Sequence, residues 1–204
     1  MRKKKTKREI YAVHPGFAMA ESVVANLKRK TGRSLPEWER LLKASGPKNP
    51  TNWREWPRAR HGLGTNTARF VAERAAGREE TYDPETYVEA LFASRPALRP
   101  IYEALLRFSL GLGKDVTVTP CKTIVPFRRK FVFAQVKPVS RTKIELGLAL
   151  GNLKPTGPLA STGGFAKGDL ITHKIPLSAL SEFDGETRRW LRRAFELCPS
   201  AEKK

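Results

Sequence analysis

The sequence predicts an α+β protein, with an N-terminal helical bundle followed by an antiparallel sheet flanked by helices. Two observations support this class. Before Gly113, apolar residues recur at the spacing of about 3.6 residues that places them on one face of a helix. After Gly113, apolar residues alternate with polar ones, as in strands that bury one face. Helical and strand patterns in separate parts of a chain are typical of α+β proteins.

Three helices are expected in the first third of the chain. The first is expected over 16–30. The second follows Ser34, because Glu37 stands three positions later and the pair has the spacing of a capping box. A third helix is expected to end at His61. It contains Pro57, which has no backbone N–H, so a kink or a delayed helix start is predicted there.

Three more helices are expected before the sheet. Thr65 is a suitable N-cap for a fourth helix, which is expected to end at Gly77. Asp83 fits the N-cap of a fifth helix, because a proline follows it at the first helical position. A sixth helix is expected over 97–110.

The second half of the chain is expected to supply the strands, at 116–119, 124–127, 131–136, 144–150 and 170–175. Residues 151–168 are rich in Gly, Pro, Ser and Thr and are expected to form a flexible loop. Asp184 is expected to cap a final helix. The predicted layout is a basic disordered tail at 1–15, a helical domain at 16–78, a helical connector at 79–95, an α+β domain at 96–198 and a tail at 199–204.

The charge of the chain is strongly positive and unevenly distributed. There are 39 Lys and Arg residues against 20 Asp and Glu, which gives a net charge of +19. Residues 1–78 hold 19 basic and 6 acidic side chains, residues 79–115 hold 4 and 7, and residues 116–181 hold 10 and 2. Two basic regions separated by an acidic connector are expected of a protein that binds a polyanion.

The composition also excludes some classes of protein. No apolar run approaches the roughly 18 to 20 residues that a membrane-spanning helix needs. The basic start is not followed by the apolar segment of a signal peptide, so a cytoplasmic protein is expected. The two cysteines, Cys121 and Cys198, form neither a disulfide framework nor a metal-binding motif.

Short segments of the chain resemble an uncharacterised bacterial two-domain family. Residues 31–42 and 61–64 resemble a small helical domain of unknown function. The chain also resembles a second uncharacterised domain at residues 98–106, 122–138, 142–148 and 172–177. This domain is often joined to the first one and is sometimes labelled a predicted transport protein. The resemblance implies this domain arrangement but no activity, cofactor or catalytic residue. Pro57 and the basic tail depart from the family pattern.

Residues 52–76 have the proportions of a DNA-binding helix-turn-helix, with a short glycine-containing turn before the second helix. Asn66 and Arg69 are candidates for contacts to base edges, because their side chains form paired hydrogen bonds to adenine and guanine. Candidate phosphate contacts are Arg58, Arg60 and Arg74. The competing interpretation is a helical corner of the kind found in any small bundle.

A second candidate surface lies in the sheet region, where basic residues are interleaved with Phe127, Phe131 and Phe133. Exposed phenylalanines stack on bases, although strand alternation favours rings that point into the core. The basic candidates of this region are Lys122, Arg128, Arg129, Lys130, Arg141 and Lys143. The N-terminal arm adds Arg2, Lys3, Lys4, Lys5, Lys7 and Arg8.

Catalytic chemistry has little support in the sequence. The glycines of 151–168 do not have the spacing of a P-loop, and His173 is expected to be a strand residue satisfied by a neighbour. Asp115 and Glu145 are the candidates for a metal-nuclease pair, but the lysine expected two positions after the acid in one common nuclease pattern is missing. No catalytic residue, metal ligand or cofactor is predicted.

The sequence therefore favours a non-catalytic nucleic-acid-binding protein. Its expected partner is DNA, RNA or a ribonucleoprotein such as the ribosome. One alternative is a module that binds a small molecule or a protein partner and uses its charge for solubility. Another is a hydrolase or nuclease whose site has no recognisable motif.

Overall fold

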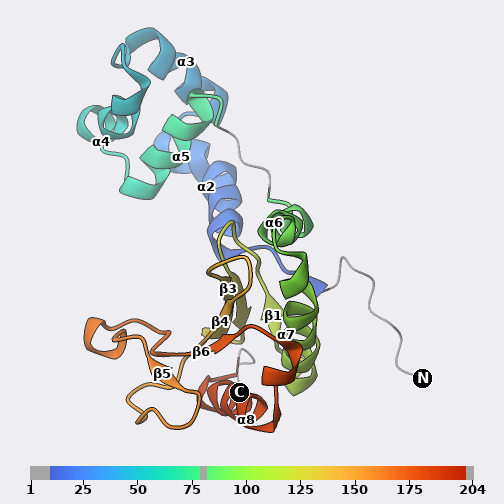
Figure 1. The fold of residues 1–204 in the computed structure, drawn as a ribbon. Helices are drawn as coiled ribbons and strands as arrows, with labels where there is room; N and C mark the ends of the chain where they lie inside the picture. Colours follow the sequence, from blue (N-terminus) through green and yellow to red (C-terminus); the bar gives the residue numbers. More distant parts are fainter. Residues whose placement is uncertain (1–9, 79–81, 201–204) are drawn as a thin grey trace. The chain divides into compact units, whose positions relative to one another are not determined.

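The computed structural model describes residues 10–78 and 82–200. Within them, seven α-helices (α2 to α8) and a six-stranded antiparallel sheet confirm the α+β class (Figure 1). The chain divides into two compact units. We call Val13–Tyr82 the helical unit, and Met1–Ala12 together with Asp83–Lys204 the sheet unit.

The helical unit is built from short helices that share one core. Its elements are α2 (Pro15–Thr31), α3 (Leu35–Ser45), the 3-10 helix η1 (Pro50–Arg54), α4 (Glu55–His61) and α5 (Thr65–Ala75). The core contains Leu27, Trp38, Leu42, Trp53, Leu63, Ala68, Val71, Ala72 and Ala75. Helices of this length are marginal alone in water, so burial of their apolar faces stabilises them.

Local signals in the sequence set where two of these helices begin. The carboxylate of Glu37 accepts hydrogen bonds from the backbone N–H and the hydroxyl of Ser34, each at 2.6 Å, and these bonds lower the pKa of Glu37. The helix α4 begins at Glu55, after the 3-10 turn, so Pro57 lies in its first turn. The predicted delay is confirmed, because first-turn residues have no intrahelical partner for an N–H.

The ends of α5 differ by one or two residues from the prediction. Gly64, not Thr65, is the N-cap; its backbone is extended, and its carbonyl accepts from the Ala68 N–H at 3.0 Å. The helix ends at Ala75, and Gly77 follows with a left-handed φ of 69°. Glycine adopts this conformation without the steric cost that other residues incur.

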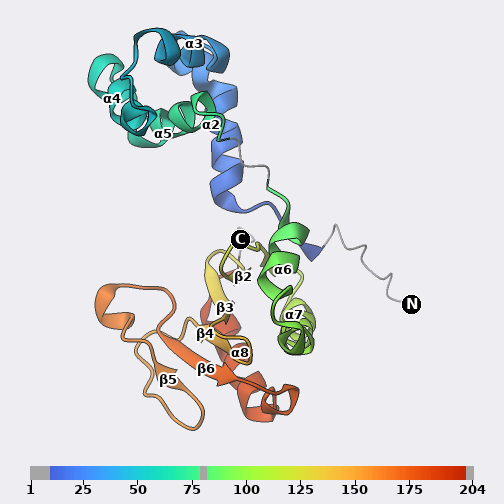
Figure 2. The same cartoon turned by 45° about the horizontal axis from the view of Figure 1, so that its top comes forward.

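The sheet unit begins with two helices and closes with one. Its helices are α6 (Pro84–Phe92), η2 (Pro96–Leu98), α7 (Arg99–Leu112), η3 (Phe165–Lys167), η4 (Leu180–Glu182) and α8 (Gly185–Leu197). Its strands are β1 (Thr117–Val118), β2 (Val125–Arg128), β3 (Val132–Pro138), β4 (Ile144–Leu148), β5 (Ala160–Ser161) and β6 (His173–Leu177). The strand order is β1-β2-β3-β4-β6-β5, and Figure 2 shows β2 to β5 in this order.

Two parts of the chain are more ordered than the sequence suggests. Residues 151–168 are not wholly a loop, because β5 pairs with β6. The last strand begins at His173, not at residue 170, because hydrogen-bonded turns occupy the chain up to Asp169. Residues 10–15 fall within the predicted tail; of these, Tyr11 forms a parallel bridge with Val118, and the His14 side chain caps α2.

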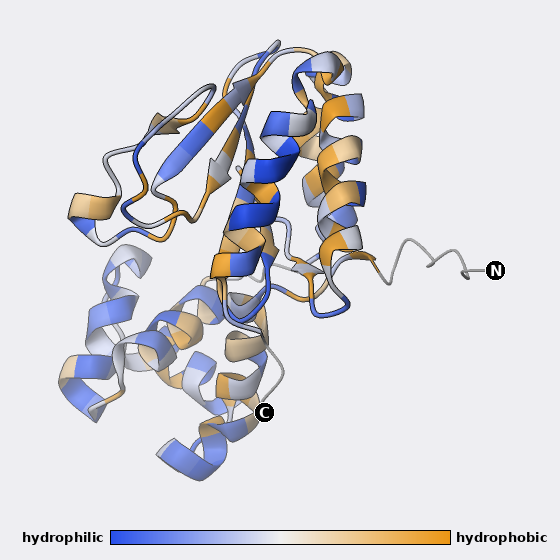
Figure 3. Cartoon of the chain, turned by 90° about the horizontal axis from the view of Figure 1, so that it is seen from below, coloured by the Kyte–Doolittle hydropathy of each residue, from blue (hydrophilic) through white to orange (hydrophobic). Residues whose placement is uncertain are grey.

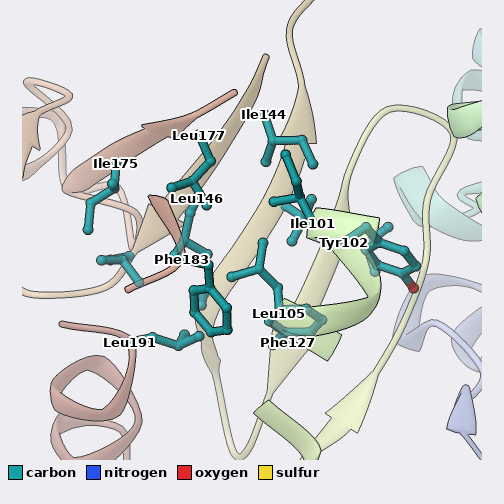
Figure 4. Close-up of a cluster of buried hydrophobic side chains, with 14 of the residues drawn as sticks. Ile101, Tyr102, Leu105, Phe127, Ile144, Leu146, Ile175, Leu177, Phe183 and Leu191 are labelled. Atoms are coloured by element: carbon teal, nitrogen blue, oxygen red, sulfur yellow. The ribbon is translucent and has the colours of Figure 1, made fainter. Parts of the chain in front are cut away.

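One face of the sheet carries the core and the other is polar. Figure 4 shows side chains of α7, the strands and α8 meeting on the core face, among them Ile101, Leu146 and Leu191. On the opposite face, Lys174 and Glu145 form an ion pair at 2.6 Å. The helices α7 and α8 therefore cover a single face.

Arg129, in the turn between β2 and β3, fastens the end of α8 to the sheet. Its guanidinium pairs with Asp115 at 2.9 Å and donates to the carbonyls of Phe195 and Cys198 at 3.2 and 2.7 Å. It also lies over the Phe195 ring, 4.1 Å from the centroid. Carbonyls at a helix C-terminus have no intrahelical donor, so a cation is favourable there. We call this set of contacts the Arg129 clamp.

Replacing Arg129 by alanine is expected to lower the free energy of unfolding by about 3 kcal/mol, because the largely buried Asp115 carboxylate would lose the guanidinium that balances its charge. The Arg129 and Asp115 side chains are only 15% and 13% exposed. Lys130→Ala is the matched control, since Lys130 is exposed next to Arg129 and should change stability by about 0.5 kcal/mol or less. Denaturant titration measures both, and equal losses would contradict the clamp.

At the N-terminus of α8, the Asp184 cap should make the free energy of unfolding depend on pH. The Asp184 carboxylate accepts from the Thr187 N–H at 2.9 Å, which lowers the pKa of Asp184. Because the folded pKa lies below the usual value of about 3.9, the stabilising contribution is present above that pH and is lost as the pH falls through the folded pKa. Asp184→Ala should therefore differ from the wild type near pH 6, and the difference should shrink on acidification.

Acid titration of the free energy of unfolding, compared between the two proteins, checks this prediction. Asp184→Asn is the control, because its amide oxygen can accept the same bond without titrating. A difference between the wild type and Asp184→Ala that stays constant down to pH 2 would contradict the role of the carboxylate.

Candidate nucleic-acid interface

The outer face of α8 concentrates positive charge. Leu191 and Ala194 are buried on its inner face. Arg188, Arg189, Arg192 and Arg193 are exposed. Two arginine pairs four positions apart fall on one side of a helix, because the helix completes a turn in 3.6 residues. Figure 3 shows the resulting strongly hydrophilic segments along α8.

This face borders a cavity with a volume of about 610 Å³. We call it the α8 groove. It is lined by Leu153, Lys154, Thr156, Glu186, Arg189, Trp190, Arg192, Arg193 and Glu196. Four cations against two carboxylates give the groove a net positive lining. Trp190 is half-buried, since it packs against the core while also lining the groove.

The four arginines of α8 are not equivalent. The guanidinium of Arg188 lies 4.9 Å from the centre of the Phe183 ring, and that of Arg192 lies 5.7 Å from the centre of Phe108. These contacts hold both groups against the surface of the unit. Arg193 has one distant carboxylate partner, Glu196 at 3.9 Å, and such an exposed pair contributes little. Arg189 and Arg193 are therefore best placed to bind a ligand in the groove.

A second group of cations gathers at one end of the sheet. Arg141 and Lys143 lie in the turn between β3 and β4, and Lys137 is near the end of β3; all three are exposed. Lys122 precedes β2, whose first residues pair with the last residues of β3, so it belongs to the same end. The Arg95 side chain donates to the Ser140 carbonyl at 3.2 Å and supports this turn.

The remaining sheet candidates lie at the opposite end, in the turn between β2 and β3. Arg128 is half-buried and Lys130 is exposed, whereas Arg129 is occupied by the clamp. Phe127 and Phe133 are fully buried, which confirms that alternation directs them into the core. Phe131 is 45% exposed. The expected single basic surface is therefore divided between two ends of the sheet.

In the helical unit, Asn66 and Arg69 are exposed and lie three positions apart on α5, so they share one side of that helix. Arg58 pairs with Glu55 at 3.0 Å. Arg60 is exposed, and Arg74 is half-buried. The arm candidates lie outside the described residues: Arg2, Lys3, Lys4, Lys5, Lys7 and Arg8.

The histidine and the carboxylates with catalytic potential are engaged in internal contacts. His173 is buried; its Nδ1 lies 2.9 Å from the Thr172 hydroxyl and its Nε2 lies 2.9 Å from the Leu153 carbonyl, as expected of a satisfied strand residue. Asp115 pairs with Arg129 and Glu145 with Lys174, so the two carboxylates are not brought together. Over residues 10–78 and 82–200, no group of three or more His, Cys, Asp or Glu side chains has the arrangement of a metal site.

The glycine-rich segment does not present converging amides to an anion. The N–H of Gly163 donates to the Ser161 hydroxyl and that of Gly164 to the Thr162 hydroxyl, both at 3.1 Å. The Asp169 N–H donates to the Gly164 carbonyl at 2.9 Å. These donors are used by the turn itself.

Another cavity of the sheet unit, of about 310 Å³, has a different character. Three glutamates line it, Glu85, Glu89 and Glu103, together with Arg99, Arg107, Tyr11, Tyr102 and several apolar residues. The hydroxyls of Tyr11 and Tyr102 are 2.9 Å apart, and burial raises the pKa of Tyr102 well above its usual range. Its three carboxylates make this cavity a poor site for a polyanion.

Comparison with known proteins assigns a family to the sheet unit. No curated protein and no solved structure matches the chain. None of the helices in the described segments is long and apolar enough to cross a membrane. Residues 88–198, more than half of the chain, match the family described as Domain of unknown function (DUF5655). This segment runs from α6 to the residue after α8, and the protein therefore belongs to the DUF5655 family.

Proposed function

We propose that the protein binds nucleic acid without catalysing a reaction on it, and that the α8 groove is its main contact. The observation that carries this proposal is the exposed arginine face of α8 around Trp190, beside a cavity of about 610 Å³. Arginine presents a planar fork of donors that matches a phosphate group. Each phosphate that is neutralised releases condensed counterions, which favours binding.

Trp190 makes single strands the preferred form of the ligand. An aromatic side chain that lines a basic groove stacks on an unpaired base, and such stacking tolerates any sequence. Bases inside a duplex are not accessible to it. The partner is then a single-stranded or looped region of RNA, alone or in a ribonucleoprotein such as the ribosome, or single-stranded DNA.

The other basic positions serve as secondary contacts. Arg141, Lys143 and Lys137 at one end of the sheet are exposed and bind phosphates without reading sequence. Asn66 and Arg69 on α5 provide a separate contact from the helical unit. Arg129 is left out of this set because its guanidinium is bound by the clamp.

The Arg189→Ala/Arg193→Ala variant tests the groove. We expect it to bind a single-stranded oligonucleotide about tenfold more weakly. The slope of log affinity against log salt should fall in magnitude by about 1.4, because two phosphate contacts are lost and each contributes about 0.7 on a single strand. Fluorescence anisotropy at several salt concentrations measures both quantities.

Two control variants separate the groove from charge in general. Lys43→Ala/Lys48→Ala removes the same charge from exposed positions of the helical unit and should leave the affinity nearly unchanged. Arg189→Lys/Arg193→Lys keeps the charge and should preserve the salt slope. An equal loss in the two alanine variants would contradict the groove, and salt-independent or absent binding to RNA and DNA would contradict nucleic-acid binding altogether.

One observation favours the alternative of a small-molecule site. The 310 Å³ cavity beside Tyr11 and Tyr102 lies within the size range of small-ligand pockets. Its lining holds three glutamates against two arginines, and this negative excess favours a cationic ligand over an anionic one. A deep pocket beside His173 and Lys122 would favour this alternative, but neither residue lines any of the three cavities of about 310, 380 and 610 Å³.

A further inference from the structure

The helical unit contains a cavity of about 380 Å³ at the junction of α2, α3, α4 and α5. We call it the Trp38 pocket. It is lined by Val23, Leu27, Lys30, Thr31, Arg33, Trp38, His61, Gly62, Leu63, Gly64 and Thr67. Its volume is in the range of cavities that hold small organic ligands. None of these described lining residues is acidic.

Three basic side chains from separate parts of the unit converge on this pocket. Lys30 comes from the last turn of α2, Arg33 from the link to α3, and His61 from the end of α4. Among the described residues, no ion pair joins any of them to a carboxylate. The contrast with the other two cavities is informative, because both of those contain glutamates. The cavity beside Tyr11 and Tyr102 has more carboxylates than cations, so an excess of positive charge is not a property of every cavity in this basic protein.

Two of the three basic groups are held in place by tryptophans. The Arg33 guanidinium lies over the Trp38 ring, 5.4 Å from its centroid. The His61 ring makes edge contacts with Trp38 and Trp56, at centroid distances of 5.1 and 4.9 Å. Exposed cations normally lose conformational entropy when they bind a ligand, and a side chain that is already held in place loses less. This arrangement favours binding.

Trp38 itself acts as the scaffold. It is 1% exposed, and its indole N–H donates to the Thr31 hydroxyl at 2.8 Å, while that hydroxyl donates to the Leu27 carbonyl at 2.8 Å. These bonds fix the ring over which Arg33 lies. The ring is too buried to stack on a base, so the ligand is recognised by its charge and by the apolar walls that Val23, Leu27 and Leu63 supply.

We propose that the Trp38 pocket binds a phosphomonoester group. A compact dianion fits the two converging cations Lys30 and Arg33 with the His61 ring beside them, and both Lys and Arg donate charge-assisted hydrogen bonds to phosphate oxygens. The volume leaves room for the organic group attached to the phosphate. Two sources share this chemistry, a free mononucleotide and the 5′-terminal phosphate of a nucleic-acid strand. The site is separate from the α8 groove and does not depend on the function proposed for it.

Titration of the full-length protein with 5′-AMP, followed by calorimetry, tests the pocket. Arg33→Ala is expected to weaken binding by about tenfold, as for loss of a charged hydrogen bond. Arg40→Ala is the matched control, because Arg40 is exposed on α3 and does not line the pocket; it should bind as the wild type does. Adenosine, which lacks the phosphate, should not bind.

Further arms identify the source and guard against misfolding. Lys30→Ala removes an exposed cation and should weaken 5′-AMP binding even if Arg33→Ala is poorly folded. Oligonucleotides with a 5′-phosphate or a 5′-hydroxyl extend the test to strand ends. Binding of 5′-AMP that depends on Arg33 indicates the mononucleotide, and a preference for the 5′-phosphate alone indicates the strand end. Either result supports the pocket.

No phosphate-dependent binding in either arm, or equal effects of Arg33→Ala and Arg40→Ala, would overturn the proposal. A result that contradicts the Trp38 pocket is distinguishable from one that contradicts nucleic-acid binding in the α8 groove. Arg189→Ala/Arg193→Ala should leave 5′-AMP binding unchanged, whereas Arg33→Ala should leave the affinity for a 5′-hydroxyl oligonucleotide unchanged.

Discussion

The position of α8 depends on one arginine in the turn between β2 and β3. Through the clamp, Arg129 joins Asp115, which lies two residues before β1, to the carbonyls of Phe195 and Cys198 at the end of α8. Asp184 caps the opposite end of the helix. With both ends fixed and Leu191 buried against the sheet, the side of α8 that carries the four exposed arginines faces away from the core. The shape and charge of the α8 groove follow from this attachment.

The cations of this protein divide by what they contact, and the net charge of +19 does not reveal the division. Arg129 stabilises the fold through Asp115, and Arg99 bridges Glu89 and Glu103. Other cations, in the α8 groove and at the turn between β3 and β4, are exposed with weak partners or none among the described residues. These exposed cations are the ones that a polyanion can reach.

Sequence patterns predicted the fold where the signal is local. The caps at Asp83 and Asp184 and the main strands follow from spacing over a few residues. The strand β5 was missed because two residues are too short to show alternation. The role of Arg129 was missed because its partners lie 14 to 69 positions away, and a turn with three adjacent cations is typical of an exposed surface.

The sequence does contain a signal for the arginine face of α8, because two pairs of arginines are spaced four positions apart. The net charge of residues 182–204 conceals this signal, because acidic residues in and around α8 offset the arginines. The groove lies within the DUF5655 match, since α8 ends before residue 198. The Trp38 pocket lies outside that match, in the helical unit.

The most direct test of the central claim is the indole N–H signal of Trp190 in ¹⁵N NMR spectra, assigned among the four tryptophans with a Trp190→Phe variant. Binding in the α8 groove predicts that this signal shifts when a single-stranded oligonucleotide is added at low salt, and returns as salt is raised. An unchanged Trp190 signal under saturating oligonucleotide, with shifts confined to other parts of the protein, would contradict it.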